Sequence, residues 1–101
     1  MKLAGKTAII TGGGRDIGAA AAKKFAAEGA NVVLSYFESS QGADTVVAEI
    51  TAAGGKAIAV QADLNVQEGV DKLVKATVDT YGAIDVLVNN ASLDGSTLLI
   101  A

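Results

Sequence analysis

The sequence contains no cysteine and no histidine, and only 19% of its residues are charged. Without cysteine there is no disulfide and no thiol chemistry, and without either residue type the usual zinc ligands are absent. The net charge of −3 and the lack of a basic cluster argue against a nucleic-acid partner. No segment is long and apolar enough to span a bilayer, and residues 1–6 lack the apolar core of a secretion signal. We therefore expect a soluble, cytoplasmic protein with no metal site, no nucleic-acid partner and no membrane association.

Half of the 101 residues are hydrophobic, and the mean hydropathy is +0.40. A chain of this length can form one small domain, but small domains have much surface per volume and usually carry more charge. The apolar composition is typical of a piece of a larger α/β core, in which parallel strands are covered on both faces.

Apolar runs and helical repeats alternate along the chain, which indicates an α/β protein with a parallel sheet. The expected strands cover residues 6–11, 31–36, 56–62 and 85–89. The expected helices cover residues 17–28, the segment from Ser39 or Ser40 to Gly54, and the segment from Asn65 to Gly82. The pattern contains no linker, repeat or low-complexity tract.

The third expected helix has the clearest periodicity. Asn65 and Glu68, three residues apart, are typical of a capping box at its start. Its apolar repeat follows helical spacing, and we interpret all of it as core packing: Val70, Leu73, Val74, Thr77, Val78 and Tyr81.

A glycine-rich turn joins the first expected strand to the first helix. Glycines allow the backbone to turn tightly and to approach an anion, and the free N–H groups at a helix start favour negative charge. The common Gly-x-Gly-x-x-Gly fingerprint does not fit, because its third glycine would fall on Ile17. The alternative reading is a glycine-rich helix entry that binds nothing.

A different spacing does fit. The segment Thr11-Gly12-x-x-x-Asp16-Ile17-Gly18 resembles the Thr-Gly-x-x-x-Gly-Ile-Gly signature of the short-chain dehydrogenase/reductase family, with Asp16 in the slot of the second glycine. We expect the Asp16 carboxylate to weaken the binding of a pyrophosphate, although an Asp there can also cap the helix.

Two later segments add to this resemblance. Asp63 and Leu64 match the family's acidic position that bonds the adenine amino group, and residues 89–91 match its Asn-Asn-Ala-Gly motif, with Ser92 in place of the glycine. Taken singly, Asp63 could be a solvated turn residue and the two asparagines could simply form a turn. However, every motif follows the carboxyl end of an expected strand, and ligands bind at such ends in open α/β sheets.

The resemblance covers residues 6–91 and implies the first half of a Rossmann-like fold. It implies a strand order of 3-2-1-4 with helices on both faces, a half-domain over residues 1–91, and a tail of unclear structure over residues 92–101. The tail could begin a helix, form a strand or belong to a later part of a longer chain. The cofactor-binding residues that the resemblance implies are Gly12, Gly14, Arg15, Asp16, Ile17, Gly18, Tyr36, Ser39, Asp63, Leu64, Asn89, Asn90 and Ala91.

The cofactor preference follows from charge. Sites that prefer NAD place a carboxylate at the end of the second strand, where this chain has Tyr36. Arg15 resembles the basic residue of members that prefer NADP, and Ser39 and Ser35 offer hydroxyl groups to a 2′-phosphate. We therefore expect NADP(H), with NAD(H) as the alternative because the Glu38 carboxylate could bond a ribose.

The family's catalytic Tyr-x-x-x-Lys pair is missing. Tyr36 is followed four residues later by Ser40, and Tyr81 by Asp85. We predict that these 101 residues are the cofactor half of an oxidoreductase acting on a carbonyl or alcohol substrate, and that they are inactive alone. The resemblance implies a homo-oligomeric parent, a dimer or tetramer. The alternatives are a nucleotide-binding or partner-dependent module and an inert fragment. Without the rest of the fold, we expect the fourth strand to present an open edge.

Overall fold

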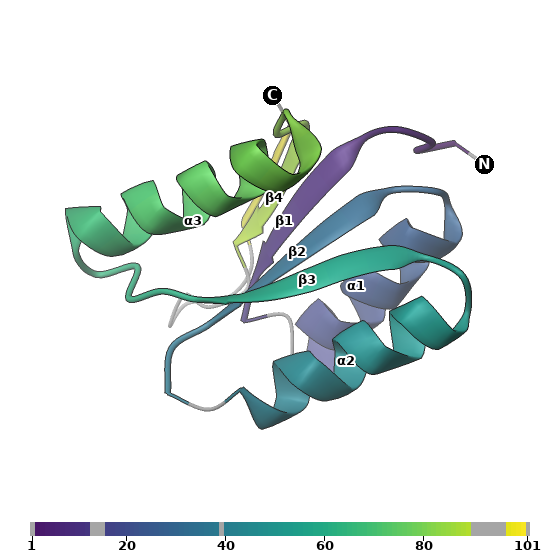
Figure 1. Ribbon diagram of the computed structural model, residues 1–101, viewed down its shortest axis with the longest axis horizontal. Helices are drawn as coiled ribbons and strands as arrows, with labels where there is room; N and C mark the ends of the chain where they lie inside the picture. The colour runs from purple at the N-terminus through teal and green to yellow at the C-terminus, as the bar shows by residue number, and fades with distance from the viewer. Residues whose placement is uncertain (1, 13–15, 39, 90–96, 101) are drawn as a thin grey trace.

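The computed structural model describes residues 2–12, 16–38, 40–89 and 97–100. These ranges form a twisted sheet flanked by helices (Figure 1). The elements, in chain order, are β1 (Thr7–Thr11), α1 (Asp16–Ala27), β2 (Asn31–Tyr36), α2 (Gln41–Ala52), β3 (Lys56–Gln61), α3 (Gln67–Tyr81), β4 (Val86–Asn89) and β5 (Thr97–Ile100). The predicted strands and helices before residue 90 are confirmed within two residues at each end.

The sheet has the order β3-β2-β1-β4-β5. The first four strands are parallel, and Ile9 of β1 lies between Val33 of β2 and Leu87 of β4. The chain thus builds the sheet outward from β1 in one direction and then crosses through α3 to the other side of β1. This confirms the predicted order 3-2-1-4 and the Rossmann-like α/β fold.

Helices cover both faces of the sheet: α1 and α2 lie on one face and α3 on the other (Figure 1). Because alternate strand residues point to opposite faces, the sheet feeds two cores. Ile10 and Leu34 pack with the α1 and α2 side, and Ile9 and Val33 pack with Leu73 of α3. All five residues of β1 are buried, as expected for a strand covered on both faces.

The start and end of α3 differ in how well the sequence predicted them. At the end, Gly82 adopts a left-handed conformation (φ 84°) and its N–H donates to the Val78 carbonyl at 2.8 Å, as expected of a terminating glycine. At the start, the predicted capping box is wrong: the N-cap residue is Val66, in extended conformation. The N–H of Asn65 instead donates to the Asp63 carboxylate at 3.0 Å, so an Asx turn replaces the cap.

The interpretation of the α3 repeat as core packing is correct for only part of it. Leu73 and Thr77 are buried, but Val70, Val74 and Val78 are 37%, 41% and 43% exposed. Successive residues are about 100° apart around a helix, so Val74 and Val78 are turned away from the direction of their buried neighbours Leu73 and Thr77. Among the described residues, α3 is the only helix on its face, and no other helix covers the valine stripe (Val70, Val74, Val78).

The expected open edge at β4 is also corrected. Residues 97–100 form β5, which pairs antiparallel with β4 from Val86↔Ile100 to Asn89↔Thr97. A strand was one of the three alternatives for this segment, and its pairing occupies the β4 backbone groups that we expected to be free. Over the described ranges, none of the helices is long and apolar enough to cross a membrane.

Candidate functional site

The carboxyl ends of β1 to β4 lie along one edge of the sheet because these strands are parallel. The structure places eight of the predicted site residues at or next to this edge: Gly12, Asp16, Ile17, Gly18, Tyr36, Asp63, Leu64 and Asn89. The chain leaves β1 toward β2 and later returns to β4 on the other side, so the crevice between β1 and β4 is a topological switch point. In open α/β sheets this is where a ligand binds.

The first turn of the site follows β1. Gly12 has φ 63°, a conformation that side chains rarely adopt. Its N–H donates to the Ser35 carbonyl at 3.1 Å and holds the turn against β2. Helix α1 then begins at Asp16, with Ile17 68% exposed and Gly18 buried. The amino end of α1 therefore lies at the edge, with the charge polarity that favours an anion.

A side-chain hydrogen bond joins β1 and β4 at the switch point. The Thr11 hydroxyl lies 3.1 Å from Oδ1 of Asn89 and 3.4 Å from the Val88 carbonyl oxygen. Thr11 is 4% exposed, so the bond forms away from bulk water and keeps the two strand ends from separating. The predicted residues Gly14, Arg15, Ser39, Asn90 and Ala91 lie outside the described residues.

The segment after β3 presents a carboxylate at the same edge. Asp63 is partly exposed, and Oδ1 of its side chain accepts the Asn65 N–H. Its other oxygen, Oδ2, makes no hydrogen bond with the residues that the structure describes. Just before it, the Ala62 N–H donates to the Tyr36 carbonyl at 2.8 Å. Leu64 packs against the core under α3. The turn thus holds one acceptor oxygen in place while leaving it available.

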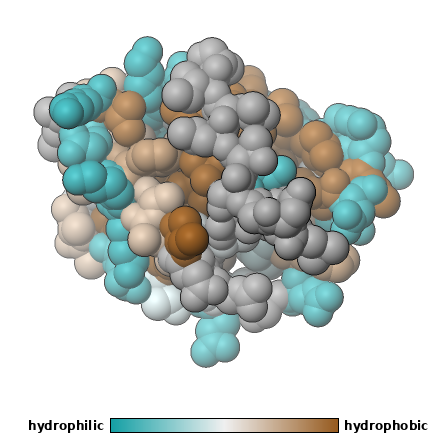
Figure 2. Space-filling view, turned by 180° about the vertical axis from the view of Figure 1, so that it is seen from behind, coloured by the Kyte–Doolittle hydropathy of each residue, from teal (hydrophilic) through white to brown (hydrophobic). Residues whose placement is uncertain are grey.

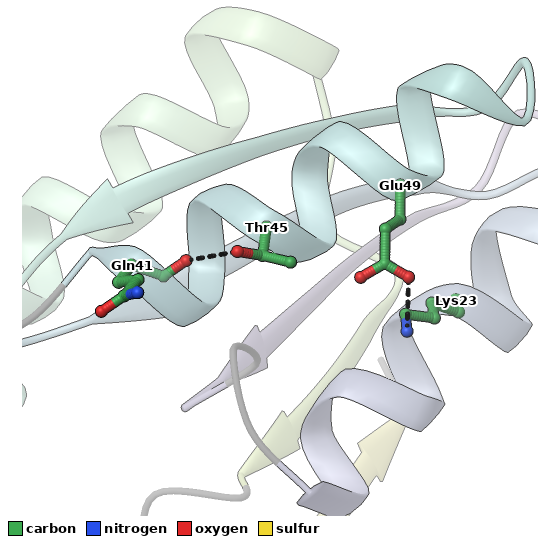
Figure 3. Close-up of polar contacts among 4 residues, drawn as sticks. All are labelled: Lys23, Gln41, Thr45 and Glu49. Carbon is green, nitrogen blue, oxygen red and sulfur yellow. Dashed lines mark hydrogen bonds and ion pairs between the residues drawn. The ribbon is translucent and has the colours of Figure 1, made fainter.

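A cleft of about 880 Å³ opens between α1 and α2 beside the end of β2. It is lined by Gly12 and Tyr36 and extends to an ion pair between Lys23 Nζ and Glu49 Oε2 at 2.8 Å (Figure 3). In the same view, the Thr45 hydroxyl donates to the Gln41 carbonyl at 2.9 Å within α2. No sequence pattern predicts this ion pair, because its two residues stand 26 positions apart on different helices.

The rear surface, viewed from behind the sheet of Figure 1, carries brown hydrophobic surface on both sides of the grey atoms (Figure 2). Six large hydrophobic side chains in the described ranges are between 37% and 68% exposed: Ile17, Phe37, Val66, Val70, Val74 and Val78. Ile17, Phe37 and Val66 belong to segments that leave or enter the sheet at the carboxyl edge. The edge therefore combines a glycine turn and polar groups with apolar side chains, as is usual for small-molecule sites.

The sequence is similar to those of known proteins along nearly its whole length. The short chain dehydrogenase family matches residues 6–99. The chain is 51% identical over 98 residues to the 3-oxoacyl-[acyl-carrier-protein] reductase of Synechocystis, covering 97% of this chain and 40% of that protein. It is 43% identical over 93 residues to the short-chain dehydrogenase/reductase homolog YusS of Bacillus subtilis, covering 92% of this chain and 85% of that protein.

A solved structure shows the same fold. The short chain dehydrogenase from Burkholderia cenocepacia, in complex with NADP, superposes with a TM-score of 0.86 at 46% identity, over 92% of this chain and 38% of that chain. The chain thus spans about 40% of the length of most relatives described here, and most of the length of the shorter YusS. With the family match over nearly all of its residues, the chain belongs to the short-chain dehydrogenase/reductase family, whose members include oxidoreductases.

Proposed function

We propose that this chain is the NADP(H)-binding portion of a short-chain dehydrogenase/reductase. The observation that carries the proposal is the convergence, at the carboxyl edge of the sheet, of a glycine turn, a helix start and an available carboxylate. These are the groups that a dinucleotide needs: close backbone approach, N–H donors for the pyrophosphate and an acceptor for the adenine amino group.

Each segment has a distinct role in this proposal. The turn from Gly12 to Gly18 and the amino end of α1 hold the ribose and pyrophosphate. Oδ2 of Asp63 accepts a hydrogen bond from the adenine amino group. Leu64 packs against the core and supports the turn that contains Asp63. Asn89, held by the Thr11 hydroxyl, forms the β4 side of the crevice, and we propose that Asn90 and Ala91 continue it.

The preference for NADP(H) rests on the end of β2. Tyr36 occupies the position where a carboxylate would favour NAD, and it lines the cleft beside α2. We assign Arg15 and Ser39 as the residues that bind the 2′-phosphate. Glu38 also lines the cleft, and its charge opposes a phosphate. Lys23 is already paired with Glu49 in that cleft. The B. cenocepacia relative was solved with NADP, which supports a nicotinamide cofactor.

A bound nicotinamide cofactor would supply hydride transfer to or from a carbonyl or alcohol carbon. Within these 101 residues we assign no catalytic residue, so we propose that the chain alone is inactive and that a parent enzyme completes the reaction. We further propose a cytoplasmic, homo-oligomeric parent, a dimer or tetramer. The half-domain then covers residues 1–91.

A second function is favoured by a specific observation. YusS is matched over 85% of its length, so a relative of nearly this size exists. We propose as the alternative a nucleotide-binding or partner-dependent module that performs no chemistry.

Calorimetric titration of the purified protein with NADPH and NADH tests the proposal. We expect NADPH to bind about tenfold more tightly, the effect of one charge-assisted contact to the 2′-phosphate. Arg15→Ala should remove that preference, whereas Lys24→Ala, on the exposed side of α1, should keep it. Equal or tighter binding of NADH would overturn the preference for NADP(H), and binding of neither would overturn the cofactor site. A carbonyl-reduction assay on the same protein separates the parent enzyme from the module.

A further inference from the structure

We infer that Gly69 is a positioning residue for the adenine contact of Asp63. Gly69 lies in the first turn of α3 and is buried. Glycine is an unfavourable residue within a helix compared with alanine, so its presence here needs a reason. The inference rests on the proposed function, because it concerns how the cofactor's adenine is recognised.

The reason is a backbone contact six residues back along the chain. A Cβ atom at position 69 would overlap the carbonyl oxygen of Asp63, and it would lie 2.5 Å from the Asp63 carbonyl carbon and 2.9 Å from its amide nitrogen. All three are backbone atoms, which cannot rotate away as the tip of a side chain can. The first turn of α3 therefore rests directly on the peptide groups of Asp63, and only glycine allows this.

The neighbouring structure leaves the Asp63 turn as the part that would move. On one side, Ala62 is 5% exposed and tied to β2 through the Tyr36 carbonyl. On the other side, α3 is anchored by Leu73 and Thr77, which are 4% and 0% exposed. The turn between these anchors is held by weaker contacts, among them Val66 N–H to the Asp63 carbonyl at 3.3 Å. A side chain at position 69 would displace Asp63.

Displacing Asp63 moves its carboxylate relative to the edge. Oδ1 accepts the Asn65 N–H at 3.0 Å within the same turn, so the carboxylate moves with the backbone. The rest of the edge is positioned by other contacts: Gly12 by the Ser35 carbonyl, and Asn89 by the Thr11 hydroxyl. A change at Gly69 should therefore weaken recognition of the adenine amino group while leaving the pyrophosphate contacts intact.

The test uses two dinucleotides that differ in that amino group. NADPH carries adenine, and its hypoxanthine analogue lacks the 6-amino group that would donate a hydrogen bond to Asp63. By calorimetry, the unaltered protein should bind NADPH about tenfold or more tightly than the analogue, the effect of one hydrogen bond to a charged group. Gly69→Ala should bring this ratio below about threefold, mainly by weakening NADPH. Glu68→Ala, an exposed neighbour in the same turn, should keep the full ratio.

A double-variant cycle identifies the route of the effect. Asp63→Ala should abolish the ratio, and adding Gly69→Ala should not change it further, because Gly69 acts through Asp63. A Gly69→Ala protein that keeps the full ratio, or that loses affinity for both dinucleotides equally, would overturn the inference. Loss of helix packing alone would lower stability but would not select between the two dinucleotides.

If Gly69→Ala does not fold, hydrogen exchange in the unaltered protein decides. NADPH should slow exchange of the Gly69 amide together with that of Asn65, and the hypoxanthine analogue should slow both less. A Gly69 amide that NADPH leaves unchanged would overturn the inference. If the unaltered protein binds neither dinucleotide, the cofactor proposal itself fails. If it binds both equally, the cofactor site stands, and the roles of Asp63 and Gly69 are wrong.

Discussion

Two adjacent residues of α3, Leu73 and Val74, should respond very differently to truncation. Leu73 is 4% exposed and packs with Ile9 and Val33 under the sheet. Its replacement by alanine removes buried carbon and leaves a cavity, so we expect Leu73→Ala to lower the free energy of unfolding by about 2–4 kcal/mol. Val74 is 41% exposed. Removing its two methyl groups would cost about 1.6 kcal/mol at full burial, and roughly 0.9 kcal/mol at this exposure.

Alanine is also the better helix former by about 0.5 kcal/mol, which leaves a net cost for Val74→Ala below about 0.5 kcal/mol. Urea unfolding of the unaltered protein and the two variants, followed by circular dichroism, measures both values. The slope of the free energy with urea should stay constant, so that the midpoints report stability. Equal losses in the two variants would refute the reasoning, because they would mean that the valine stripe is covered in solution.

Three further predictions concern other parts of the fold. Asp85→Ala removes the carboxylate that accepts a hydrogen bond from the Thr7 N–H at 2.8 Å. Because Thr7 is 1% exposed, we expect urea unfolding to show that the free energy of unfolding falls by about 1–3 kcal/mol. Asp85→Asn, which keeps an acceptor oxygen, should lose much less. Burial raises the pKa of Tyr81 above its ordinary value, so Tyr81 ionises at a lower pH in the unfolded chain than in the folded one. The stability that neutral Tyr81 contributes should be complete below about pH 10 and should be lost as pH rises through the raised pKa. Urea unfolding at about pH 8 and 10.5 should show this loss in the unaltered protein but not in a Tyr81→Phe protein. Asp16→Gly should tighten NADPH binding in calorimetry, and unchanged or weaker affinity would show that the carboxylate is no obstacle.

The strands were predictable because the sheet imposes a simple demand on them. β1 and β2 are covered on both faces, so they require continuous apolar runs, which the sequence shows plainly. The ends of the strands predicted the candidate edge because parallel strands place their carboxyl ends together, and Gly12, Asp63 and Asn89 lie at or just after three of these ends.

The errors lie where the outcome depends on a contact rather than on spacing. A helical repeat shows which residues share a face, but not how far the neighbouring layer extends, so it did not reveal the exposure of Val70, Val74 and Val78. The capping pattern at Asn65 was local and correct in form. However, the Asn65 N–H, which the Glu68 side chain would bind in a capping box, donates instead to the Asp63 side chain two residues earlier.

The role inferred for Gly69 also depends on a contact that sequence spacing does not reveal. A glycine within a helical pattern is visible in the sequence as an unfavourable choice. Its contact with the Asp63 backbone depends on the angle at which α3 leaves the turn. The contact becomes apparent only when the two backbones are seen together.

The outer edge of β4 is where the two proposed functions make different demands on the chain. A strand edge can pair with one further strand, and in this structure β5 holds it in antiparallel register. A doubly wound sheet of the full family size continues beyond β4 with another parallel strand. In a parent enzyme that strand and residues 97–100 would compete for the same backbone groups, so β5 would have to leave. In a module without further strands, β5 closes the edge and protects it from pairing with other chains. The occupancy of this edge therefore distinguishes the two proposals by structure alone, before any activity is measured.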